Sequence, residues 1–239
     1  MSINVRVRVG VEWINNFHDD SCNQNDLDYC DDQSVGFYNT MGSHGHFKIF
    51  NWGDDNAWET DLKHPDFGGD SLNWSDDVHF LYYNDHGGNW SNTLHLAFSV
   101  AHNNCLSSSR QWRLGKKNLK WFIAGGCEGV LNTDASHIAA VWGGPMQGVH
   151  LVLGFIGNSH DTWWTDDLGE DFADDICDGD SIAGAWVDRA YSFWVDDDSI
   201  AIAAGEARDD AINRRNNENL NWRDLPVRST NWLAWKYKR

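Results

Sequence analysis

The sequence is poor in positive charge. It holds 18 Lys and Arg residues against 36 Asp and Glu residues, which leaves a formal net charge of −18 over 239 residues. Nucleic-acid phosphates and anionic membrane surfaces are bound by clusters of Lys and Arg, so this balance argues against both partners. It predicts a highly charged, solvated surface, which would also steer basic partners or substrates toward the protein.

Long apolar runs are missing as well. No segment approaches the ~18 continuous apolar residues of a membrane span, and residues 1–9 lack the apolar core of a signal peptide. We therefore expect a soluble, cytoplasmic protein, with an export signal already removed as the alternative. The sequence also lacks internal repeats, low-complexity segments and Pro-rich linkers, so we expect a single domain over residues 1–239.

Cysteine is scarce and shows no CxxC spacing. The five cysteines stand at positions 22, 30, 105, 127 and 177, and because their number is odd, at least one thiol stays unpaired within the chain. This suits a reducing compartment. A disulfide between Cys22 and Cys30 is possible.

Apolar runs and alternating patterns predict strands separated by helices. Val5, Val7, Val9 and Val11 alternate with other residues, which is typical of a strand with one polar face. Further strands are predicted at 78–83, 93–100, 119–124, 149–155, 199–204 and 232–237, and helices after Asp134, over 168–176 and after Ser181. This order predicts an α/β three-layer sandwich with a mostly parallel sheet. Residues 14–77 show no clean period, so we expect an irregular insertion there.

Two reactive residues follow two of these apolar runs. His86 comes after the run 78–83 and is followed by Gly87 and Gly88, whereas Cys127 comes after the run 119–124 and two further glycines. Ligands of open α/β sheets collect at the carboxyl ends of strands. An imidazole beside a thiol favours the thiolate, which is the form that attacks. Each residue alone is more often structural, but together they predict a catalytic dyad.

The glycines beside these residues suit an oxyanion hole. Gly87 can bring its backbone N–H close to a ligand because it has no Cβ. The N–H groups of Gly87 and Cys127 could then share the negative oxygen of a tetrahedral intermediate. The glycines around Cys127 predict a tight turn that presents its side chain.

An apolar strand ending in His-Gly, followed by one ending in a small residue and Cys, resembles the caspase-like cysteine peptidases, which include caspases, legumains, gingipains, separases and CHAT domains. The local Cys127-Glu128-Gly129 is similar to the caspase Cys-x-Gly, and the resemblance extends over about residues 78–195. The chain also resembles an uncharacterised bacterial family of similar length with a Gly-Val-Glu-Trp strand, here residues 10–13. Gly126 departs from the usual Ala before the cysteine.

The resemblance implies roles for individual residues. Cys127 would attack, and His86 would polarise the scissile carbonyl or protonate the leaving group. The substrate pocket would be lined by Asp85, Glu128, Asp161 and Trp163. Asp85 stands where a small residue is usual, and its carboxylate would favour the imidazolium form of His86 and orient its ring.

Two patterns suggest metal binding but fit it poorly. The acidic run over 166–180 has no EF-hand spacing, and its acids fall opposite Leu168, Phe172 and Ile176, which is typical of a solvated helix face. The pair His44 and His46 has no adjacent third ligand. We therefore expect no metal and no cofactor.

The leading hypothesis is a Cys/His-dependent enzyme that hydrolyses, or transfers the acyl group of, an amide, ester or thioester in a small-molecule or peptide substrate. The 15 Trp residues keep two alternatives open, because aromatic faces bind flat or cationic ligands. One is a biosynthetic cyclase or condensing enzyme that uses the same aromatic cleft. The other is a non-catalytic binding module on the same fold.

Overall fold

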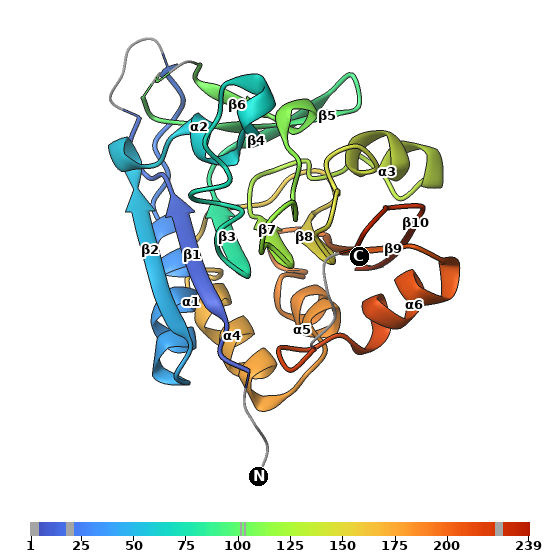
Figure 1. The fold of residues 1–239 in the computed structure, drawn as a ribbon. Coiled ribbons are helices and arrows are strands. Elements are labelled where there is room, and N and C mark those ends of the chain that lie inside the picture. Colours follow the sequence, from blue (N-terminus) through green and yellow to red (C-terminus); the bar gives the residue numbers. More distant parts are fainter. Residues whose placement is uncertain (1–4, 18–21, 101, 103, 223–226) are drawn as a thin grey trace.

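The central element of the computed structural model is a seven-stranded, mostly parallel sheet (Figure 1). The structure describes residues 5–17, 22–100, 102, 104–222 and 227–239. The strand order is β10-β9-β8-β7-β3-β1-β2, in which β2, β1, β3, β7 and β8 are parallel and β9 is antiparallel to both of its neighbours. The strands span β1 (Arg8–Trp13), β2 (Phe47–Gly53), β3 (Phe80–Asn84), β7 (Trp121–Ala124), β8 (Leu151–Phe155), β9 (Ser199–Gly205) and β10 (Trp232–Lys238).

A second, antiparallel sheet and six α-helices complete the described fold. The small sheet has the order β4 (Gly87–Trp90), β5 (Thr93–Ala97) and β6 (Leu106–Ser108). The helices are α1 (Cys30–Ser43), α2 (Glu59–Leu62), α3 (Ala135–Trp142), α4 (Leu168–Asp178), α5 (Ile182–Arg189) and α6 (Arg208–Asn217), with short 3₁₀ turns at 54–56, 65–67 and 109–111. The predicted α/β class is therefore confirmed.

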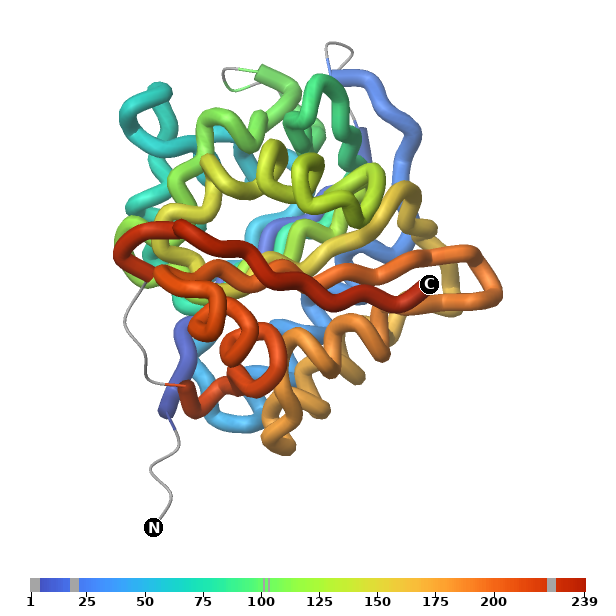
Figure 2. Tube along the Cα trace, turned by 90° about the vertical axis from the view of Figure 1, so that its right-hand side faces the viewer, coloured from blue at the N-terminus to red at the C-terminus, as the bar shows by residue number. Residues whose placement is uncertain are grey.

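Each face of the central sheet carries its own hydrophobic core. Side chains alternate between the faces of a strand, so Phe80 and Tyr82 of β3 join one core and Leu81 and Tyr83 the other. The first core is closed by α1, α4 and α5, and the second by α3 and the small sheet. Viewed along the β10 edge, α3 lies on one side of the sheet and α5 and α6 on the other (Figure 2).

The segment 14–77 differs from its prediction, because residues 30–53 are largely regular. Helix α1 packs on α4, and β2 pairs in parallel with β1 at the edge of the central sheet. The sequence pattern did not show this because α1 buries Gln33 and Ser34 beside Phe37, and because β2 leaves Phe47 and Ile49 exposed. Neither element therefore has a clean apolar period.

The disulfide pairing also differs from the one that the sequence left open. Cys22 is bonded to Cys105, 83 residues away, whereas Cys30 is a buried free thiol. The spacing of the cysteines along the sequence does not predict a disulfide between such distant segments. Disulfides persist mainly in oxidising compartments, so this bond argues against the cytoplasmic location, which stays a prediction. Within the described residues, no helix is both long and apolar enough to cross a membrane.

Buried carboxyl groups lie next to the end of β1. Glu12 is fully buried, and neither of its carboxylate oxygens has a hydrogen-bond partner among the described residues. Burial raises its pKa well above the ordinary value, and the nearby Asp61 raises it further. Asp61 is itself 2% exposed, and burial raises its pKa to about 7. The folded state therefore favours the protonated form of this pair.

We expect Asp61 to set part of the pH dependence of stability. The folded protein keeps a proton on Asp61 up to about pH 7, whereas the unfolded chain releases it near pH 4. The free energy of unfolding therefore falls as the pH rises through this range, by at most about 1.4 kcal/mol per pH unit for one group. In Asp61→Asn, whose side-chain oxygen can still accept from the backbone N–H of Trp58, this fall is expected to be shallower.

Urea unfolding at several pH values between about 5 and 8 measures this dependence. Asp178→Asn, at an exposed position, is the matched control and should follow the wild-type profile. An Asp61→Asn profile as steep as that of the wild type would contradict the assignment.

Candidate active site

The carboxyl ends of β3, β7 and β8 bring the predicted reactive residues to one edge of the central sheet. These strands are parallel neighbours, so the loops that follow them start side by side. A pocket of about 360 Å³ opens there. Its lining includes Asp85, His86, Cys127, Ser159, His160, Asp161, Trp164 and Asp197. The structure therefore places His86 and Cys127 in the wall of the same pocket.

Two glycines allow the ends of β3 and β7 to touch. A Cβ on Gly87 would lie 2.5 Å from the carbonyl oxygen of Cys127, and one on Gly126 would lie 2.8 Å from the backbone N of Gly87. Because no Cβ atom tolerates backbone at such distances, these positions require glycine. The close approach brings the backbone that follows His86 directly against the backbone of Cys127.

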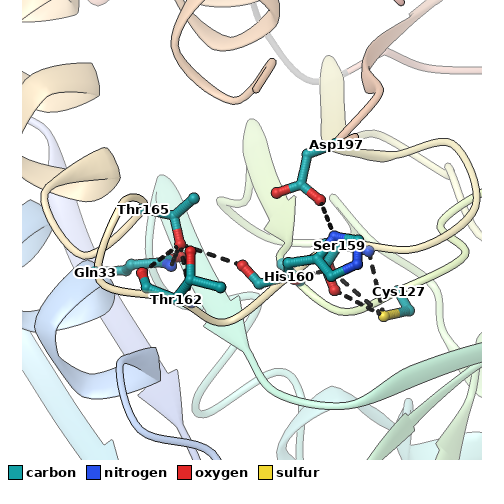
Figure 3. Close-up of polar contacts among 8 residues, drawn as sticks. Gln33, Cys127, Ser159, His160, Thr162, Thr165 and Asp197 are labelled. Atoms are coloured by element: carbon teal, nitrogen blue, oxygen red, sulfur yellow. Dashed lines mark hydrogen bonds and ion pairs between the residues drawn. The ribbon is translucent and has the colours of Figure 1, made fainter. Parts of the chain in front are cut away.

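The Cys127 thiol is half-buried and contacts the loop after β8 (Figure 3). Its Sγ lies 3.3 Å from the backbone N of Ser159, 3.3 Å from the carbonyl oxygen and 3.6 Å from Oγ of the same residue. The carbonyl oxygen can accept the S–H proton, whereas the N–H can donate to a sulfur that carries negative charge. The backbone of Ser159 therefore offers a partner to both forms of the thiol.

The His86 ring is held by the segment that precedes α1. Its Nε2 lies 2.8 Å from the carbonyl oxygen of Asn25, and the Phe17 ring lies 5.6 Å from its own ring. A carbonyl oxygen only accepts hydrogen bonds, so Nε2 carries a hydrogen and donates. Among the described contacts, no hydrogen bond joins the His86 ring to the Cys127 sulfur. The two residues share a pocket without a direct bond.

Asp85 is a buried residue of the pocket lining and does not bond to the His86 ring. Its carboxylate accepts from the backbone N–H of His86 and lies 3.1 Å from the Tyr83 hydroxyl, which also contacts the Ala97 carbonyl. Burial raises the pKa of Asp85 well above its ordinary value. The predicted orientation of the imidazole by this carboxylate is therefore wrong, because the backbone and Tyr83 occupy the oxygens.

Neither Gly87 nor Glu128 belongs to the pocket lining. Ala97 N donates to His86 O, so in this antiparallel pair the N–H of Gly87 faces away from β5. Glu128 lies outside the lining, because its backbone N–H donates to Gly157 and its carboxylate accepts from Asn89 N at 2.7 Å. The structure thus turns Glu128 away from its predicted place in the substrate pocket.

The loop after β8 supplies the other predicted pocket residues. Asp161 lines the pocket and accepts from the backbone N–H groups of Asp28 and Tyr29. Burial raises the pKa of Asp161 above the ordinary value. Trp163 is 58% exposed and stacks on Trp164, and it is Trp164 that lines the pocket. The predicted pocket position of Trp163 therefore belongs to its neighbour.

The same loop carries an imidazole to which sequence reasoning gave no role. Nδ1 of His160 lies 2.7 Å from Oδ1 of Asp197, and both residues line the pocket. Burial raises the pKa of Asp197 to about 6, although the contact with His160 opposes the rise. The strand-end rule that selected His86 and Cys127 also applies to His160, which follows β8. Asp197, 37 residues further on, had no comparable signal.

Metal ligation finds no support in the described part of the chain, where no group of three or more His, Cys, Asp or Glu residues could hold an ion. On α4, Asp171 and Asp175 bind Arg189 at 2.7 and 2.6 Å. Two acids of the run 166–180 thus form ion pairs with α5 at the surface.

A family model matches residues 11–232, which is most of the chain. Its description is "Domain of unknown function (DUF6345)". No curated protein matches the chain.

The contact between Gly87 and Cys127 predicts a specific effect of adding one methyl group. In Gly87→Ala, the new Cβ meets the Cys127 carbonyl, so the ends of β3 and β7 have to separate. Overpacking of this kind costs about 1–3 kcal/mol, and we expect the free energy of unfolding to fall by that amount. Gly144→Ala, whose Cβ would meet nothing within 4 Å, is the control. Equal stability of the two variants in urea unfolding would contradict the close contact.

Proposed function

The chain belongs to the DUF6345 family, and we propose that it is a cysteine-dependent enzyme that hydrolyses an amide, ester or thioester or transfers its acyl group. The observation that carries the proposal is the half-buried Cys127 thiol in the wall of the strand-end pocket, with His86 in the same wall. A nucleophile has to be accessible to its substrate, and a half-buried thiol in a pocket wall meets this requirement.

The other free thiols are poor nucleophiles, which supports Cys127. Cys30 also lines the pocket, but burial raises its pKa well above the ordinary value. Cys177 is half-buried like Cys127, yet burial and the neighbouring acids Asp174 and Asp178 raise its pKa to about 12. Because only the thiolate attacks, both are expected to react slowly.

His86 would polarise the substrate carbonyl, and the backbone of Gly87 and Cys127 would bind its oxygen after attack. A carbonyl oxygen that takes the place of the Asn25 oxygen would accept the Nε2 hydrogen of His86 and be polarised. After attack by Cys127, the N–H of Gly87, which faces away from β5, and the N–H of Cys127 would hold the oxyanion. This division of roles follows the resemblance to the caspase-like peptidases, and the adjacency of β3 and β7 supports it.

A biosynthetic role in the same pocket is the alternative. Trp164 in the lining, stacked on the exposed Trp163, offers an aromatic surface for a substrate other than a peptide. The acyl transfer at Cys127 would be the same, with a hydroxyl or amine in place of water.

The reactivity of the three free thiols tests the proposal. With iodoacetamide and peptide mapping by mass spectrometry, we expect Cys127 to be alkylated first, ahead of Cys177 and Cys30. A Cys127 no faster than Cys177 would contradict a catalytic thiol.

Activity is measured on a panel of activated esters, thioesters and peptide amides. Cys127→Ala should lower turnover at least about a thousandfold, as removal of a covalent nucleophile does in other enzymes. Cys177→Ala, the matched control, should retain wild-type turnover. Full activity of Cys127→Ala would reject covalent catalysis, and ligand binding without any turnover by the wild type would indicate a binding module.

A further inference from the structure

The strand-end pocket holds two imidazoles, and they differ in the hydrogen bonds that they make. His86 donates from Nε2 to a backbone carbonyl, that of Asn25. His160 instead has a carboxylate on Nδ1, from Asp197 at 2.7 Å. A carboxylate at Nδ1 holds the hydrogen on that nitrogen and leaves the lone pair on Nε2. Of the two rings, His160 therefore has the arrangement of a base at its far nitrogen.

Asp197 is a buried, well-anchored partner for this ring. It is 2% exposed and stands two residues before β9, and its own backbone exchanges hydrogen bonds with Ser192. The His160 side chain is 44% exposed, and it lines the pocket. The contact therefore joins a buried carboxylate to a half-exposed imidazole of the pocket lining.

Ser159 connects this pair to the thiol. Its backbone N and O both lie 3.3 Å from the Cys127 sulfur, and His160 is the next residue along the chain (Figure 3). The sulfur therefore contacts the loop that carries the His160 imidazole, and both residues line one pocket. In unliganded enzymes, catalytic hydrogen bonds are often longer than in the working complex.

We propose that His160, oriented by Asp197, is the base that takes the proton of Cys127 and returns it to the leaving group. The inference rests on the proposed function and adds a residue to it, while His86 keeps its role at the substrate carbonyl.

The proton and bond changes balance without a further reactant. The S–H proton of Cys127 passes to Nε2 of His160, the sulfur bonds to the carbonyl carbon, and the bond from that carbon to the leaving atom breaks as Nε2 protonates the leaving atom. Water then gives a proton to Nε2 and bonds to the carbonyl carbon. The sulfur–carbon bond breaks, and the thiol recovers its proton from Nε2.

The rate of Cys127 alkylation by iodoacetamide at different pH values tests the inference, because it reports the thiolate and requires no substrate. We expect His160→Gln and Asp197→Asn to lower this rate about tenfold or more near pH 6, because the thiol then lacks the oriented base that takes its proton. Near pH 9 the rates should converge with that of the wild type, which shows that the pocket is still folded. Asp197→Glu should restore part of the loss.

The exposed pair His44 and Asp174, 2.9 Å apart, provides the matched control. His44→Gln and Asp174→Asn remove the same kind of contact outside the pocket and should follow the wild-type profile. A loss near pH 6 in His86→Gln but not in His160→Gln would overturn the role of His160 and leave the cysteine enzyme standing. A wild-type Cys127 no more reactive than Cys177 at every pH would overturn the proposed function itself.

Discussion

The parallel pairing of β3 with β7 is the constraint on which the pocket depends. Phe80 pairs with Trp121 and Tyr83 with Ala124, so both strands end at the same level of the sheet. The next residues then meet backbone to backbone, which Gly87 and Gly126 permit. A shift of one residue in this register would turn each side chain to the opposite face. The two hydrophobic cores that hold the register therefore also hold the reactive residues.

Around this pairing, the segment before α1 closes the pocket through backbone groups. The segment before α1 gives the Asn25 carbonyl to His86, and the N–H groups of Asp28 and Tyr29 to Asp161. The same segment is joined to Cys105 through Cys22. In a chain with a net charge of −18, pocket carboxylates need such donors. Asp161 accepts hydrogen bonds from backbone N–H groups, and Asp197 contacts the imidazole of His160.

Much of the sheet could be predicted from the sequence, because its inner strands are covered on both faces and show as apolar runs. The runs at 78–83, 119–124 and 149–155 contain most of β3, β7 and β8, and the residues after them line the pocket. Helix α1 and strand β2 could not be found this way, since one buries polar groups and the other exposes apolar ones. The pairs Cys22–Cys105 and His160–Asp197 join segments far apart in the sequence, where local pattern carries no signal. Trp164 and Trp163 are adjacent, and only the path of the loop decides which one faces the pocket.

The crystal structure of the protein reacted with a peptide aldehyde tests the central claim most directly, because an aldehyde adds reversibly to a nucleophilic thiol. We expect continuous density from the Cys127 sulfur to the aldehyde carbon, with the aldehyde oxygen facing the N–H of Gly87 and an imidazole nitrogen within hydrogen-bond distance. An adduct on Cys177, or a Cys127 that stays unmodified while the aldehyde occupies the pocket, would contradict it.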